Sequence, residues 1–168
     1  MKKLALTDFA KYRYPSALEL SPDGRYLTFA LKEVDREGDG YRWNLWLYDL
    51  ESRESRQITQ GDDQRKAVWE DNTHILYKTT EPDEAMRARG FEEEWTVYHR
   101  LNVCTGEERE AFRLPMSVSG LWKMDEGRYV FTGETHLDRP NLLELTGEAL
   151  EKELVRRQQT KGYKVLTE

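Results

Sequence analysis

The chain contains the stretch Leu18-Glu-Leu-Ser-Pro-Asp-Gly-Arg-Tyr-Leu-Thr-Phe-Ala-Leu31, and this stretch decides the fold. Pro22 presets the backbone of a tight turn, and Gly24 tolerates the positive φ that usually follows. The residues after the turn alternate with the two-residue period of a pleated strand. Further strand-like runs follow at 43–50 and 56–59. Four short strands joined by turns make one blade of a β-propeller.

The strand–turn–strand pattern occurs three times along the chain. Its turns carry Asp23, Asp71 and Asp125. The later blade strands are expected at 44–47, 96–103 and 141–145. A period of about 50 residues built from short strands is typical of propellers. The sequence therefore predicts a mainly β chain, a partial β-propeller of about three four-stranded antiparallel blades plus one C-terminal helix.

These patterns divide a single partial propeller domain, residues 1–168, into segments. We expect a leader at 1–13, blades at 14–60 and 64–114, a partial blade at 116–145, a helix at 146–162 and the start of a further strand at 163–168. A short helical turn is expected from Thr7, which can cap it, and another after Pro82, because proline suits the first helical position. Thr146 is the expected cap of the C-terminal helix, and Gly162 its expected end.

Composition excludes several classes of protein. With 38% hydrophobic residues, five Trp and nine Tyr, the chain has too much apolar surface for disorder. Its net charge of −6, with no basic cluster beyond Arg156-Arg157, argues against nucleic-acid binding. Cys104 is alone, so no intrachain disulfide and no zinc site are expected. The apolar run Leu4-Ala-Leu6 is too short for a signal peptide or a membrane span, so we expect a cytoplasmic protein.

The chain resembles the N-terminal part of the propeller domain in the prolyl oligopeptidase family of serine peptidases, the S9 group, and is most similar to its acylaminoacyl-peptidase-like branch. The residues that carry the resemblance are the turn at 20–24, the strands at 44–50 and 56–59, and the segment 138–142 that leads into a Glu-rich helix. The resemblance implies a non-catalytic propeller that gates or shapes peptide access to an α/β-hydrolase domain. Similar Ser-Pro-Asp-Gly blades occur in TolB-type propellers, so a free-standing TolB-like binding or scaffold module is the alternative.

The catalytic part of such a peptidase is missing from the sequence. The family's nucleophile lies on a Gly-x-Ser-x-Gly elbow, and no such string occurs in the chain. The nearest, Met116-Ser-Val-Ser-Gly120, lacks the first glycine. The alternation of strands and helices that builds a hydrolase domain is absent as well. We therefore expect no catalytic residue in this chain, and interpret it as a fragment or the product of a truncated gene.

Two groups of polar residues are interpreted as structural and not as catalytic or metal-binding. Without a serine elbow, we interpret His74, His99 and His136 as surface or packed side chains and not as members of a triad. The stretch 35–40 faintly resembles the start of a calcium loop, but Trp46 occupies the twelfth position, where that loop needs a bidentate Glu. We therefore expect neither a metal nor another cofactor.

The run Glu92-Glu93-Glu94 is the one candidate for substrate binding. Some relatives with exopeptidase activity present paired acids from the propeller to hold the amino terminus of a substrate, and carboxylates are suitable acceptors for an ammonium group. The resemblance thus implies Glu92 and Glu93 as substrate-binding residues. The competing interpretation is a solvated start of the strand that continues through Trp95.

Two further expectations concern packing. Trp69 and Trp122 each precede an acidic turn, and we predict that both are buried between neighbouring blades. A closed propeller needs at least about four blades, so a chain of about three leaves apolar flanks and unpaired strand edges. We therefore expect self-association, through the open faces or by strand exchange through residues 163–166.

Overall fold

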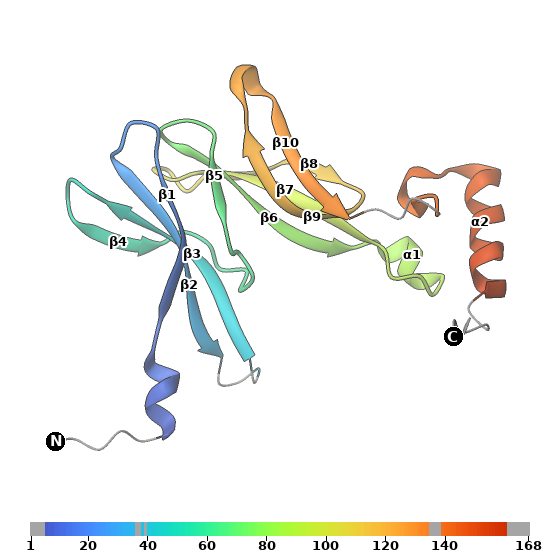
Figure 1. Ribbon diagram of the computed structural model, residues 1–168, viewed down its shortest axis with the longest axis horizontal. Helices are drawn as coiled ribbons and strands as arrows, with labels where there is room; N and C mark the ends of the chain where they lie inside the picture. The colour runs from blue at the N-terminus through green and yellow to red at the C-terminus, as the bar shows by residue number, and fades with distance from the viewer. Residues whose placement is uncertain (1–5, 36–37, 39, 135–138, 161–168) are drawn as a thin grey trace, which may run out of the picture. The chain divides into compact units, whose positions relative to one another are not determined.

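The computed structural model describes residues 6–35, 38, 40–134 and 139–160. Their strands form two four-stranded sheets and one two-stranded sheet (Figure 1). Residues up to 79, together with 97–113 and 121–131, form a first compact unit, and the remainder of the chain forms a second. The prediction of a mainly β chain built from four-stranded antiparallel sheets that do not close is confirmed.

The first sheet has the order β1-β2-β3-β4 and follows a short 3-10 helix, η1 (Leu6–Lys11). Its antiparallel strands are β1 (Tyr14–Leu20), β2 (Tyr26–Asp35), β3 (Gly40–Asp49) and β4 (Glu54–Gln57). The turn between β1 and β2 forms as predicted. The Ser21 hydroxyl donates to Asp23 at 2.7 Å, and the amide of Tyr26 donates back to that hydroxyl at 2.9 Å. Gly24 has a φ of 76°, which explains the glycine at this position.

The second sheet repeats this order with β5 (Ala67–Trp69), β6 (His74–Pro82), β7 (Glu94–Asn102) and β8 (Glu108–Leu114). Its first turn uses the same chemistry, because Asp71 accepts hydrogen bonds from the amides of Thr73 at 2.7 Å and His74 at 2.8 Å. A helical turn follows Pro82 as expected, as α1 (Glu84–Ala88), but Pro82 is the last residue of β6 and does not occupy the first helical position. Asp83 caps it by accepting from the amide of Met86 at 2.9 Å.

The third copy contributes two strands, β9 (Ser117–Lys123) and β10 (Tyr129–Glu134), joined through the 3-10 helix η2 (Asp125–Gly127). The strand predicted at 141–145 is wrong. This segment contains the 3-10 helix η3 (Leu142–Glu144), because the side chain of Asn141 accepts from the amide of Leu143 at 3.0 Å and caps a helical turn. Figure 1 shows η3 leading into the helix α2 (Gly147–Thr160). Gly162 and the strand expected at 163–168 lie outside the described residues.

The main core lies where the first two sheets pack face to face. Ala30, Leu45 and Leu47 of the first sheet meet side chains of the second, among them Trp69. Trp69 is 8% exposed, stacks against Tyr26 with ring centroids 6.5 Å apart, and donates its indole N–H to the carbonyl of Glu19 at 3.1 Å. The predicted burial of Trp69 between blades is confirmed.

The same prediction for Trp122 is wrong, since this side chain is 47% exposed. Its neighbour Leu121 is 3% exposed. Successive residues of a strand point to opposite faces, so the burial of Leu121 turns Trp122 outward. Trp122 lies three residues before its acidic turn residue, whereas Trp69 lies two before its own. This offset of one residue exchanges the two faces.

The second unit has a small core of its own. Met86 of α1 and Phe91 pack with Leu142 of η3 and Leu154 of α2. Leu142 and Leu154 are almost completely buried, at 0% and 2% exposure. Leu150 packs against this cluster from one turn earlier in α2. This cluster therefore fixes α2 next to the segment that carries the acidic run.

Candidate peptide-binding hollow

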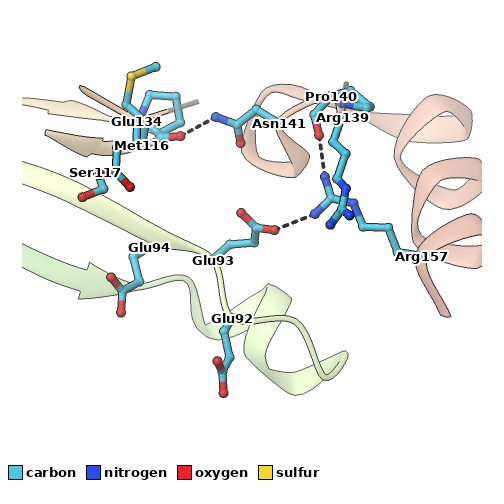
Figure 2. Close-up of a pocket in the computed structure, with 11 residues that line it drawn as sticks. Glu92, Glu93, Glu94, Met116, Ser117, Glu134, Arg139, Pro140, Asn141 and Arg157 are labelled. Atoms are coloured by element: carbon cyan, nitrogen blue, oxygen red, sulfur yellow. Dashed lines mark hydrogen bonds and ion pairs between the residues drawn. The ribbon is translucent and has the colours of Figure 1, made fainter. Parts of the chain in front are cut away.

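A hollow of about 300 Å³ opens in the second unit (Figure 2). Its walls come from the segment before β7, the connection from β8 to β9, the end of β10 and the C-terminal helical region. The lining residues are Glu92, Glu93, Glu94, Pro115, Met116, Ser117, Glu134, Arg139, Pro140, Asn141 and Arg157. The acidic run identified in the sequence thus forms one wall of a concave site.

The backbone around α1 holds the acidic run in place. Phe91 is 5% exposed, and its amide donates to the carbonyl of Met86 at 3.0 Å. The amide of Asp83 donates to the carbonyl of Glu93 at 2.8 Å, and the indole of Trp95 donates to the Asp83 carboxylate at 2.9 Å. Glu92 and Glu93 therefore lie in a tied segment directly before β7.

Arg157 of α2 organises the opposite wall. Its guanidinium binds Glu93 at 2.9 Å and Glu153 at 3.0 Å, and it also donates to the carbonyl of Pro140. Hydrogen bonds from Arg156, and then from Arg157, outweigh partial burial and lower the pKa of Glu153 to about 2. The Arg157 guanidinium is thus held between two carboxylates, and Glu93 is oriented by it.

The two predicted binding residues face different ways. The Glu93 carboxylate points toward Arg157, whereas the Glu92 carboxylate points away from it (Figure 2). Glu92 and Glu94 are exposed, and Glu93 is half-buried. Four carboxylates line the hollow, from the three residues of the run and Glu134, against the two guanidiniums of Arg139 and Arg157. The excess of negative charge suits a cationic group that can donate several hydrogen bonds.

The sequence indicates the acidic wall of the hollow but not the other walls. The pairs Glu153–Arg156 and Glu153–Arg157 have the spacing of neighbours on one helical face, but Arg157 and Glu93 are 64 positions apart. Nothing local in the sequence signals that contact. Asn141, which donates to the carbonyl of Pro115, is another part of the site that only the fold brings in.

The described histidines lie in the first unit, outside the hollow. His74 Nδ1 lies 3.0 Å from a carboxylate oxygen of Asp71 in the turn before β6. His99 of β7 lies between its cross-strand neighbours, with Nε2 2.9 Å from the Thr79 hydroxyl and Nδ1 3.5 Å from Glu108. Both are packed side chains on strands, as predicted. His136, and residues 36, 37 and 39 of the calcium-like stretch, lie outside the described residues.

The chain matches no known family profile and no curated protein. Solved structures do resemble it. The β-propeller domain of the Trilobed protease from Pyrococcus furiosus, which has an open velcro topology, matches with a TM-score of 0.53 and 14% identity over 73% of this chain. An acylaminoacyl peptidase from Pyrococcus horikoshii matches with a TM-score of 0.58 and 12% identity over 77%. An acylaminoacyl peptidase in complex with Z-Gly-Gly-Phe-chloromethyl ketone matches with a TM-score of 0.57 and 13% identity over 79%.

These similarities show a propeller-type fold. The matched region spans 34% of the Trilobed protease propeller chain, and 19% and 20% of the two acylaminoacyl peptidase chains. The sheets β1–β4 and β5–β8 are therefore blades of a propeller-type fold. Within the described part of the chain, no helix combines the length and apolar character needed to cross a membrane.

Proposed function

We propose that this chain is the blade-forming, non-catalytic part of an S9-type serine peptidase, and that it gates or shapes the access of peptides to an α/β-hydrolase domain carried elsewhere. The observation that supports the proposal is the pair of successive four-stranded blades, which resemble the propeller parts of a protease and of two acylaminoacyl peptidases. The Pro-Asp-Gly turn of the first blade, in which Gly24 has a positive φ, is one of the features on which the resemblance to S9 propellers rests.

In this proposal, the acidic hollow binds the amino terminus of a peptide. The α-ammonium of a peptide would donate hydrogen bonds to the Glu93 carboxylate and, once the exposed Glu92 side chain rotates toward the hollow, to the Glu92 carboxylate. Arg157 orients the Glu93 carboxylate, and it competes with the incoming ammonium for the same oxygens. The exposed carboxylate of Glu94 lies in the same wall and adds to the attraction.

The first test concerns the missing hydrolase. The isolated chain should hydrolyse neither aminoacyl nor acylaminoacyl fluorogenic substrates, and no serine should react with a fluorophosphonate probe. The natural reading frame and its immediate neighbours should encode further blades and a Gly-x-Ser-x-Gly elbow. Probe labelling of this chain would contradict the proposal. A natural stop codon with no hydrolase gene nearby would favour a TolB-like scaffold.

The second test concerns the hollow. A short peptide with a free amino terminus should shift the amide resonances of residues 92–94 in an NMR titration, and the acetylated peptide should not. The double substitution Glu92→Gln and Glu93→Gln should abolish that difference, because it removes the charge but keeps the shape. Glu107→Gln, at an exposed position outside the hollow, is the matched control. Equal shifts with free and acetylated peptides would exclude the amine-binding role.

A further inference from the structure

Arg157 already occupies a carboxylate to which the proposed function assigns the amino terminus of a peptide. Its Nη1 lies 2.9 Å from Oε1 of Glu93, and the two side chains are half-buried, at 20% and 24% exposure. Figure 2 shows the guanidinium directed toward Glu93 from the side of α2. Arg157 is therefore an internal cation at the position where an external cation is expected.

The same guanidinium has further acceptors on its own side of the hollow. Its Nε donates to Oε1 of Glu153, one helical turn earlier in α2, at 3.0 Å, and its Nη2 donates to the carbonyl of Pro140. A guanidinium carries five N–H donors in a fixed plane, so it can serve several acceptors at once. Loss of the contact with Glu93 therefore does not leave the charge of Arg157 without partners.

Glu153 holds the guanidinium from the helix side. It is 8% exposed and also accepts two hydrogen bonds of 2.7 Å from Arg156. It lies four positions before Arg157, the spacing of neighbours on one helical face. Glu153 is not among the residues that line the hollow. It can therefore influence a ligand there through Arg157, but not by touching the ligand.

The docking of α2 does not depend on the contact between Arg157 and Glu93. Leu154 is 2% exposed in the apolar core of the second unit. At the end of α1, the Arg89 guanidinium binds the Glu151 carboxylate through two hydrogen bonds, at 2.9 and 2.6 Å. These contacts keep the helix in place when Arg157 leaves Glu93, so the occupied and vacated states of Glu93 differ mainly in one side chain.

We propose that Arg157 determines the specificity of the hollow, because a ligand must displace it from Glu93, and that Glu153 positions Arg157 for this release. The inference rests on the proposed amine-binding function. A primary ammonium can replace the guanidinium, since it is a cation with three N–H donors. An acylated amino terminus is neutral and leaves the ion pair intact. The hollow thus selects peptides with free amino termini through competition as well as through attraction.

The experiment measures the dissociation constant of the tripeptide amide Ala-Ala-Ala-NH₂ by NMR titration, with its acetylated form alongside. Arg157→Gln should strengthen binding of the free-amine peptide about 10-fold, because Glu93 then has no competing cation. Glu153→Gln should weaken it about 3-fold, because Arg157 loses a charged partner on α2 and binds Glu93 more firmly. The double variant should bind as Arg157→Gln does, since Glu153 acts through Arg157.

Arg89→Gln is the matched control, since it breaks another ion pair of α2 at a residue outside the hollow. It should leave the dissociation constant unchanged, and unchanged far-UV circular dichroism should show that all variants are folded. Three results would overturn the inference and leave the amine-binding role standing: no gain with Arg157→Gln, an equal gain with Arg89→Gln, or an effect of Glu153→Gln that persists in the double variant. Equal binding of the free and acetylated peptides by every protein would overturn both.

Discussion

Two tryptophans with similar sequence surroundings differ in how deeply they are buried. Trp69 is the last residue of β5 and Trp122 the last but one of β9, each shortly before an acidic turn residue, yet Trp69 is 8% exposed and Trp122 is 47% exposed. The indole of Trp69 stacks on Tyr26 and donates to a backbone carbonyl of the preceding blade. Among the ring contacts within the described residues, Trp122 has a cationic neighbour, the Lys66 ammonium, 5.8 Å from its ring centroid.

The comparison shows that the number of residues between a side chain and the turn decides whether that side chain is buried, more than the residue type does. In a strand, an offset of one residue moves a side chain to the other face. The face that Trp69 uses packs on the first blade, whereas Trp122 lies on the face of β9 opposite to the buried Leu121. Substitutions in the seam at Trp69 and on the exposed face at Trp122 should therefore differ in their effect on stability.

The largest expected effect is at Trp69. Trp69→Ala should lower the free energy of unfolding by about 3–5 kcal/mol, because it leaves a cavity in the seam between two blades. Trp69→Phe keeps an aromatic ring but loses the hydrogen bond to Glu19, and it should cost less. Urea unfolding followed by circular dichroism is the measurement. Equal midpoints for Trp69→Ala and the wild type would show that the seam contributes little.

The next effect concerns Glu70, which joins the second blade to β10. Its side chain is 7% exposed and accepts hydrogen bonds from Arg100, at 2.6 Å from Nη2, and from the Tyr129 hydroxyl. Glu70→Ala should cost about 1–3 kcal/mol, because it leaves the half-buried donors of Arg100 and Tyr129 without their acceptor.

Tyr129→Phe is the matched test of this network, since it removes only the hydroxyl and should cost about 1 kcal/mol. Both costs are read from urea midpoints, as for the seam. If Glu70→Ala and Tyr129→Phe had equal effects, the ion pair with Arg100 would contribute nothing beyond the tyrosine bond.

The blades could be predicted from sequence because their signals are local. The turn at Pro22 and Gly24 and the acidic turn residue Asp71 each act through their own backbone neighbours. The segment 141–145 could not be predicted in this way. Its Asn-Leu pattern resembles the strand at 44–47, but the Asn141 side chain caps a helical turn there instead. Tertiary packing of the buried Leu142, which no local pattern shows, also stabilises that helical turn.

Only the acidic wall of the candidate hollow could be predicted from the sequence. The acidic run is visible as three consecutive Glu residues. Its relation to Arg157 depends on how η3 and α2 return to the segment before β7, and no local pattern encodes that path. The exchange of faces at Trp122 has the same origin, because a strand pattern shows alternation but does not say which face has a neighbour.

A smaller effect is expected at Asp71, in the turn that follows Trp69. Its contribution to the free energy of unfolding should depend on pH. Partial burial tends to raise the pKa of Asp71, but the amides of Thr73 and His74 and the side chains of both residues outweigh it and lower the pKa to about 2. The depressed pKa stabilises the fold above the unfolded value, about 3.8, and this stabilisation is lost as the pH falls through that value toward 2.

The corresponding variant is Asp71→Asn, whose amide oxygen can still accept the two backbone hydrogen bonds. Its urea midpoint should fall less than that of the wild type between pH 6 and pH 3. The Asp71 side chain is 57% exposed, so solvent screening should keep the difference below about 1 kcal/mol. Parallel pH profiles for the two proteins would mean that the Asp71 charge contributes no stability to this turn.

The smallest expected effect is at Trp122, and it completes the comparison. Trp122→Ala should change the free energy of unfolding by less than about 0.5 kcal/mol in dilute solution, because an exposed side chain loses little packing when it is truncated. The Lys66 contact at 5.8 Å adds at most a weak cation–π attraction. Urea unfolding with Trp69→Ala run in parallel is the measurement. A loss of more than about 2 kcal/mol would mean that Trp122 is packed as Trp69 is, and the distinction between the seam and the exposed face would fail.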